Sequence, residues 1–285
     1  MTLHVAIIGI DGSGKSTVTP ALASLAAAEL SVTAAAVGDD VWCKTPAEDL
    51  RVPGFAPDGD MLPLRLSRLL RRVAKSAAAH RRLYPPLKLL HLAAQAWTVR
   101  QVADRYRPDV IFCEGNLLLS AAARAINYVD AQSAPSFAGG AAAASTNPFP
   151  YLEVLYAYVM EGKLLSPHVT RAIPGLKMLR RLRWLDARLK LGLMRLPDAI
   201  VYLDIAPEAA LARLMASGQK LDRHENIRDL TQARVMYRHV VSFFRRHWGE
   251  RYAAAIDVTS LSVGQTLQRI LDFVRTLPIW TVENG

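Results

Sequence analysis

The nine residues Gly9–Thr17 read GIDGSGKST and separate two apolar segments near the start of the sequence. The apolar run at 5–8 is short and rich in β-branched residues, which predicts a buried strand. The run that follows Thr17 is rich in Ala and Leu, which predicts a helix. Gly12 and Gly14 allow the backbone between them to turn so that successive N–H groups point inward. This pattern therefore predicts an anion-binding loop between a strand and a helix.

The anion that fits such a loop is the phosphate chain of a nucleoside triphosphate. Gly9, Gly14, Lys15 and Ser16 match the pattern G-x-x-x-x-G-K-[ST]. In this pattern the lysine reaches the β- and γ-phosphates and the hydroxyl binds Mg²⁺, so we expect ATP and Mg²⁺ as cofactors. The expected nucleotide-binding residues of the loop are Gly9, Asp11, Gly12, Ser13, Gly14, Lys15, Ser16 and Thr17.

The amino-acid composition is typical of a globular protein, and the distribution of its charged residues indicates a charged partner. Of 285 residues, 51% are apolar and 21% are charged, and no apolar run approaches the length of a membrane-spanning helix. The two cysteines are too far apart in sequence to indicate disulfides or a zinc site, and no signal-peptide pattern is present, so we expect a cytoplasmic protein. The net charge of +10 gathers in acid-free stretches at 61–103 and 162–185, which indicates an anionic partner.

Strand-like and helical runs alternate along the chain. This alternation predicts an α/β fold, a parallel β-sheet covered by helices on both faces, of the P-loop NTPase type. The segment 43–63 is interrupted by Pro and Gly and predicts a loop. We expect a single domain over 1–285, with a mostly helical insertion at about 117–196 and a lid at about 217–226.

Three motifs together resemble the thymidylate kinase family and its nucleoside and nucleotide kinase relatives: GIDGSGKST, LPDAIVYLDIAPEAALARL at 196–214 and DRHE at 222–225. The resemblance covers 3–40, 105–116 and 197–275. It implies a phosphotransferase that moves the γ-phosphoryl group of ATP to a small acceptor beneath a mobile lid that bears an arginine. Outside the loop the matching positions are Asp204, Pro207, Glu208, Arg213, Asp222, Arg223 and Glu225.

The lid carries two cations, Lys220 and Arg223. A kinase must shield its γ-phosphate from water and neutralise charge that develops during transfer, and a hinged basic loop does both. Arg223 is the expected catalytic residue, because a planar guanidinium matches phosphoryl oxygens with two parallel hydrogen bonds. Lys220 and Arg213 are expected to contact the nucleotide, although Arg213 could also lie on the surface of its helix.

Acidic residues end two of the predicted strands. Glu114 should emerge at the ligand-binding edge of the sheet, where it would hold Mg²⁺ through water or orient the acceptor. Asp39 and Asp40 leave the preceding strand at the same edge. The resemblance implies that one of them accepts or positions the proton of the attacking hydroxyl. Only one of the two is expected in this role, because the side chains of neighbouring residues on an extended chain point in opposite directions. With Lys15 and Arg223, these three acids complete the expected catalytic set.

The sequence leaves the chemical identity of the acceptor open. Where thymidylate kinases have an Asp-Arg pair, this chain has CEGN at 113–116, and the segment GDDVW at 38–42 also departs from the family. A nucleoside or nucleoside monophosphate is the expected acceptor. The alternatives are a non-nucleotide alcohol, a lipid-like acceptor at a membrane surface, or a nucleotide-dependent switch or binding protein.

The basic insertion leaves the choice of partners open as well. Leucines recur every three or four residues through 174–197, which indicates a helix packed on the core with a basic face in solvent. The same pattern is compatible with peripheral membrane contact, with Trp184 at the boundary. No nucleic-acid-binding module is recognised, so nucleic acid is not an expected partner, and a homodimer stays open.

Overall fold

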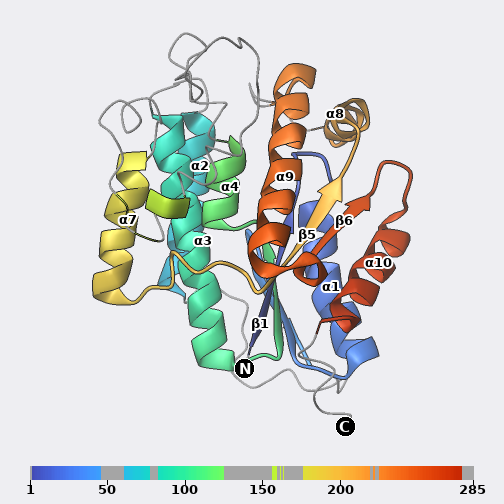
Figure 1. Cartoon of the computed structure of the whole chain (residues 1–285), viewed down its shortest axis with the longest axis horizontal. Coiled ribbons are helices and arrows are strands. Elements are labelled where there is room, and N and C mark those ends of the chain that lie inside the picture. Colours follow the sequence, from blue (N-terminus) through green and yellow to red (C-terminus); the bar gives the residue numbers. More distant parts are fainter. Residues whose placement is uncertain are drawn as a thin grey trace.

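The computed structural model describes residues 2–45, 61–77, 83–124, 156–158, 161, 163, 176–218, 221 and 225–277. Within these residues the chain forms one six-stranded sheet with helices on both faces (Figure 1). Its order is β3-β2-β4-β1-β5-β6. The strands are β1 (Leu3–Ile8), β2 (Ala34–Val37), β3 (Val41–Lys44), β4 (Val110–Glu114), β5 (Ala199–Asp204) and β6 (Ala253–Asp257). The predicted α/β class is confirmed.

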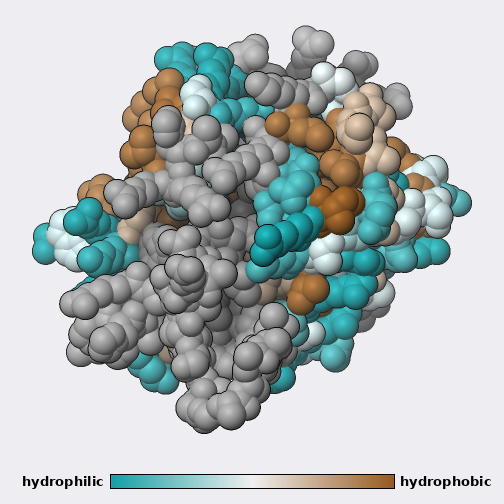
Figure 2. Space-filling view, turned by 90° about the horizontal axis from the view of Figure 1, so that it is seen from above, coloured by the Kyte–Doolittle hydropathy of each residue, from teal (hydrophilic) through white to brown (hydrophobic). Residues whose placement is uncertain are grey.

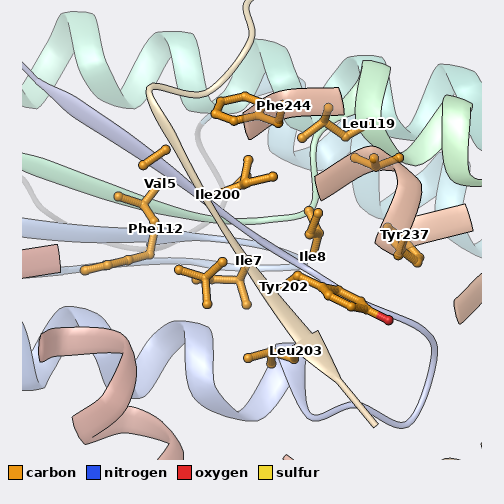
Figure 3. Close-up of a cluster of buried hydrophobic side chains, with 14 of the residues drawn as sticks. Val5, Ile7, Ile8, Phe112, Leu119, Ile200, Tyr202, Leu203, Tyr237 and Phe244 are labelled. Carbon is orange, nitrogen blue, oxygen red and sulfur yellow. The ribbon is translucent and has the colours of Figure 1, made fainter. Parts of the chain in front are cut away.

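Strand β1 lies in the middle of the sheet and leads directly into the GIDGSGKST loop. It pairs in parallel with β4 on one side and with β5 on the other, and all six of its residues are buried. A parallel strand covered by helices on both faces needs apolar side chains on both, which explains its nearly unbroken apolar run. Figure 3 shows Val5, Ile7 and Ile8 of β1 in a cluster with apolar side chains of β4 and β5.

The edge strand β3 differs from the sequence prediction. Its residues pair antiparallel with β2, so the sheet is not entirely parallel, and the strand reaches into the segment expected to be a loop. The register joins Val37 to Val41 across a three-residue connection, so β2 and β3 form a tight hairpin. A strand of four residues, two of which are only partly buried, is too short for a clear alternation pattern.

The helices form two layers. On one face α1 (Lys15–Leu30) packs against α10 (Val263–Arg275), and on the other lie α3 (Tyr84–Tyr106), α4 (Leu117–Arg124) and α9 (Ile227–Trp248) (Figure 1). Helix α2 (Leu62–Ser76) packs on α3, and α8 (Pro207–Ala216) contacts α9. A 3₁₀ turn at Glu250–Tyr252 leads from α9 into β6. None of the helices in the described ranges is long and apolar enough to cross a membrane.

The described part of the predicted insertion contains α4 and α7 (Leu176–Leu189), which packs against α3. Leu179 and Leu182 are buried in the main core, as expected for a core-facing stripe. Trp184 is exposed, and the Arg188 guanidinium lies 5.0 Å from the centre of its ring. The chain from 190 to 198 is not helical, so the helical prediction was wrong for the last part of this segment. The limits of the insertion and of the lid stay predictions.

Candidate active site

The loop between β1 and α1 follows the geometry that its glycines allow. Gly12 has a φ of 82°, and a Cβ atom there would lie 2.5 Å from the carbonyl oxygen of Ala210 on α8. Gly14 has a φ of 94° and immediately precedes α1. Glycine has no side chain that could cap the helix. The amide of Thr17 donates to the carbonyl oxygen of Gly14 over 3.0 Å, which leaves the first two amides of α1, those of Lys15 and Ser16, to bind another acceptor. These groups and the positive end of the helix dipole form an anion site.

Lys15 lies folded within this loop. Its ammonium donates hydrogen bonds to the carbonyl oxygens of Gly9 (2.9 Å) and Ile10 (2.8 Å) and lies 4.0 Å from the carboxylate of Asp11. The two carbonyls are neutral acceptors, and a phosphate oxygen makes a stronger, charge-assisted bond to an ammonium. Of the other predicted loop residues, Ser13 is buried, whereas Ser16 and Thr17 are exposed.

The loop is joined to the end of β4 by one hydrogen bond. The hydroxyl of Ser16 donates to Oε1 of Glu114 over 2.8 Å, although 98 residues separate the two in sequence. The other carboxylate oxygen faces Gly38, where a Cβ atom would lie only 2.9 Å from Oε2. The structure thus brings together Ser16 and Glu114, the two residues predicted to bind metal.

This pair fits a magnesium ion. Mg²⁺ prefers oxygen ligands and keeps several waters, so that one or two protein oxygens and the substrate phosphates complete its shell. Ser16 and Glu114 supply such oxygens side by side at the exposed edge of the loop. Among the residues that the structure describes, no cluster of three or more His, Cys, Asp or Glu could hold a metal by itself. The arrangement is suited to an ion that arrives with a nucleotide.

Asp39 and Asp40 lie in the hairpin between β2 and β3, and not on an extended segment as expected from sequence. The amide of Gly38 donates to the carbonyl of Asp40, which closes the turn. Both carboxylates form ion pairs with α2: Asp39 with Arg71 and Asp40 with Arg68. Arg68 also donates to the carbonyl of Asp39 over 3.3 Å. The basic residues of α2 that face this turn therefore serve to hold it.

The two aspartates differ in their surroundings. Burial raises the pKa of Asp39, the charge of Arg71 opposes this, and the charge of Glu114 adds to the rise. The charge of Lys88 also lowers the pKa of Asp39, but the net direction is upward. The carboxylate of Glu114, which accepts the hydrogen bond from Ser16, is thus one of the charges that act on Asp39. Asp40 has a side chain that is 49% exposed, against 30% for Asp39.

Arg213 joins α8 to the loop that follows β6. Its guanidinium donates to the carbonyl oxygens of Val258 (2.8 Å) and Thr259 (3.4 Å). The hydroxyl of Thr259 in turn accepts a hydrogen bond from the amide of Ala206, at the start of α8. Arg213 therefore shapes a loop at the carboxyl edge of the sheet, near the phosphate-binding loop that α8 also contacts through Ala210.

Asp204, at the end of β5, is the centre of an ion-pair network whose partners the sequence prediction missed. Its carboxylate accepts from Arg234 (2.6 Å), from Arg238 (2.6 Å) and from the hydroxyl of Tyr202 (3.0 Å). Burial raises the pKa of Asp204, but these hydrogen bonds outweigh it and the net shift is downward. The sequence feature that could have revealed these partners is the spacing of Arg234 and Arg238, which are four residues apart and therefore lie on one face of α9. The network ties the first half of α9 to the sheet edge beside β1.

The lid residues Lys220 and Arg223 lie outside the described residues, and so does Asp222 of the DRHE motif. The structure describes the approach to this segment on both sides. Helix α8 ends at Ala216, and α9 begins after Asn226, whose side chain accepts a hydrogen bond from the amide of Asp229. The roles of Lys220 and Arg223 stay predictions.

A pocket opens beside Glu114 and follows the face of the sheet that α3 covers. Strand residues such as Ala6 and Cys113 form its floor, and α3 and the segment 192–197 form its walls. The cavity between these walls has a volume of about 40 Å³. Figure 2 shows the molecule from above the view of Figure 1, and the coloured residues on that face are both hydrophilic and hydrophobic.

No family model and no curated protein matches the chain. Among solved structures the chain is similar to a deoxyadenosine kinase from M. mycoides, whose structure has the products dCMP and dCDP bound. The alignment covers 96% of this chain and 100% of that chain, with 13% sequence identity and a TM-score of 0.49.

Proposed function

We propose that this protein is an ATP-dependent phosphotransferase that moves the γ-phosphoryl group to a small acceptor, a nucleoside or nucleoside monophosphate. The observation that carries the proposal is the 2.8 Å hydrogen bond between Ser16 and Glu114. It joins a phosphate-binding loop to a carboxylate at the carboxyl edge of the sheet, where a metal ion bound to the nucleotide and an attacking group would both have to lie.

The donor half of the reaction would use the loop and the start of α1. Backbone N–H groups after Gly12 and Gly14 would hold the phosphate oxygens of ATP, and Lys15 would leave its two carbonyl partners to bind the β- and γ-phosphates. Ser16 and Glu114 would hold Mg²⁺, which neutralises phosphate charge when bound. Arg213 supports this half indirectly, because it shapes the loop around Val258 at the carboxyl edge of the sheet.

The acceptor half would use the hairpin turn. An oxygen of the acceptor attacks the γ-phosphorus, the bond from that phosphorus to the bridging oxygen breaks, and ADP leaves with the electron pair. When the attacking group is a hydroxyl, its proton must go to a nearby base. Asp39 is the candidate that we favour over Asp40, because it is the less exposed and is coupled electrostatically to Glu114. We keep Arg223 as the predicted cation of the lid.

The experiment that tests this proposal is a screen for acceptor-dependent ADP release. Nucleosides, nucleoside monophosphates and small alcohols are each added to the protein with ATP and Mg²⁺, and ADP is measured against a reaction without acceptor. We expect ADP in proportion to the acceptor consumed. The Lys15→Ala variant is the control for contaminating kinases, and it should show no acceptor-dependent release. If no compound raises ADP above the background, the protein is not a kinase of these acceptors and a nucleotide-dependent switch becomes the better hypothesis.

A further inference from the structure

The outer face of α2 exposes large apolar side chains. Leu62, Leu66, Leu69 and Val73 recur every three or four residues, so they form one row along the helix, which we call the α2 stripe. Their exposed fractions are 65%, 38%, 55% and 42%. The stripe is about 16 Å long, at a rise of about 1.5 Å per residue. Single exposed apolar residues are ordinary on a protein surface, but a continuous row of them marks a surface that contacts a partner.

The inner face of α2 carries mostly smaller side chains. The helix packs on α3, and Leu64 is buried in a cluster with residues of β2 and β4 (Figure 1). The other buried residues of the helix are Pro63, Ser67 and Ala74. Burial of apolar surface is the main favourable contribution to folding, so a helix that only had to cover the core would bury its leucines and expose the small residues. The side chains of α2 are largely arranged the other way round.

The stripe is bordered by positive charge. Arg65 and Arg72 each follow a member of the stripe by three residues, so they lie along one side of it, and both are exposed. No acidic residue occurs between 61 and 103, so α2 itself carries no negative charge. An arginine can lay its carbon chain along an apolar surface while its guanidinium stays among polar groups. An apolar row bordered by cations is typical of a helix that lies in the plane of a membrane surface.

The rotation of α2 about its own axis is fixed by contacts on its inner side. Arg68 and Arg71 form ion pairs with Asp40 and Asp39 in the turn between β2 and β3. Leu64 is at the same time held in the core. The helix cannot turn its stripe inward without breaking these contacts, so the stripe stays on the surface and is available to a partner.

The charge of α2 decides which partner fits the stripe. In a symmetric dimer through this face, α2 of one copy would meet α2 of the other. The helix contains arginine and lysine but no acid, so such a dimer would bring like charges together. An anionic lipid surface has the opposite charge and attracts each cation that comes near it. The lipid surface is therefore the better complement to this face.

We propose that α2 docks on an anionic membrane surface, with the stripe in the apolar layer beneath the head groups and with Arg65 and Arg72 at the lipid phosphates. The inference goes beyond the proposed function and does not rest on it. It assigns the membrane contact to α2, and not to the basic face of α7 around Trp184.

The test is binding of the full chain to lipid vesicles of two compositions. The protein is mixed with vesicles of phosphatidylcholine alone, or of phosphatidylcholine with phosphatidylglycerol, and the bound fraction is measured by sedimentation. We expect binding to the anionic vesicles that weakens as salt screens the charges. Binding to the neutral vesicles should be at least about tenfold weaker, because each cation near an anionic surface strengthens binding about fivefold.

Matched double variants locate the contact, since each removes one exposed apolar side chain and one exposed arginine. Leu69→Gln/Arg72→Gln on α2 should weaken binding to anionic vesicles about 25-fold, about fivefold for each change. Val263→Gln/Arg269→Gln on α10, which packs against α1 on the other face of the sheet, is the control and should bind like the wild type.

A third double variant tests the competing helix. Trp184→Gln/Arg181→Gln on α7 should bind within a few-fold of the wild type. Thermal unfolding of every variant shows whether it is folded. If the α2 double variant is not, the single change Arg65→Gln takes its place, with an expected loss of about fivefold.

The inference is overturned if the wild type does not bind anionic vesicles at low salt, or if it binds neutral vesicles equally well. It is also overturned if the α7 variant loses binding and the α2 variant does not. Analytical ultracentrifugation without lipid tests the second copy as partner: a dimer that Leu69→Gln/Arg72→Gln converts to a monomer would show that the stripe is covered by self-association, and would overturn the inference. Vesicle binding needs no nucleotide, so its failure leaves the proposed function untouched, and a protein that binds vesicles but releases no ADP would support the inference alone.

Discussion

Replacing each aspartate of the β2–β3 turn by asparagine should separate a catalytic carboxylate from a structural one. Asp39→Asn and Asp40→Asn remove one negative charge each and keep the size of the side chain. If Asp39 is the base, its loss should reduce kcat by about 10²–10⁴-fold, the usual contribution of a positioned general base. Asp40→Asn should leave kcat within a few-fold of the wild type, because Asp40 holds the turn through its ion pair with Arg68.

The effects on stability follow from the same contacts. The pair of Asp40 and Arg68 is 49% and 36% exposed, so its loss should cost no more than about 1 kcal/mol of the free energy of unfolding. Burial raises the pKa of Asp39, and the net shift is upward in spite of Arg71, so the folded protein disfavours its charged form. A neutral asparagine at 39 removes the partner of Arg71 but also an unfavourable buried charge, so it should change the stability at pH 7 little, and thermal unfolding of the variant distinguishes a loss of kcat from a folding defect.

The assay is acceptor-dependent ADP release at saturating ATP, measured between pH 4 and 8, with thermal unfolding of each variant in parallel. The carboxylate must be ionised to accept a proton, so wild-type kcat should rise with pH through a pKa above the ordinary value of 3.8. This rise should be absent in Asp39→Asn and present in Asp40→Asn. The reasoning is refuted if Asp39→Asn retains near wild-type kcat, and Glu114 then becomes the candidate base.

Three further predictions concern the loop, its packing and the Asp204 network. Lys15→Ala should reduce phosphoryl transfer by at least about 10²-fold while the melting temperature changes little, since Lys15 faces the loop and not the core. Gly12→Ala should lower the melting temperature, because its Cβ atom would lie 2.5 Å from the carbonyl oxygen of Ala210. The control Gly264→Ala, on α10, should raise the melting temperature slightly, because its Cβ atom would meet open space among the described residues. Equal shifts in the two variants would contradict this prediction. Asp204→Asn should lose about 1–3 kcal/mol at pH 7 in urea unfolding. Because the pKa of Asp204 is lowered in the folded state, this stabilisation is fully present above the ordinary value of 3.8 and is lost as the pH falls through the lowered pKa, so the difference between variant and wild type should shrink as the pH is lowered below 4.

The sequence by itself determined the features that depend on neighbouring residues. The GIDGSGKST loop, the strand before it and the helix after it are contiguous, so their turn chemistry and periodicity are visible in one short stretch. The position of Glu114 was also predictable, because the carboxyl ends of parallel strands meet at one edge and bring it within 2.8 Å of Ser16. The α/β class followed from the same alternation of strands and helices.

Only the tertiary structure decided the features that depend on register and on packing between distant segments. The four residues of β3 turn back beside β2, which places Asp39 and Asp40 in a hairpin held by α2 instead of on an extended strand. The partners of Asp204 in its two ion pairs are 30 and 34 residues away in sequence, and they reach it only because α9 lies over β5. His4 reads in sequence as one polar residue in an apolar strand. Its burial in a pocket wall beside Arg100 and Arg195 exists only because α3 and the chain before β5 pack on that face of the sheet, and a one-dimensional pattern contains no record of such contacts.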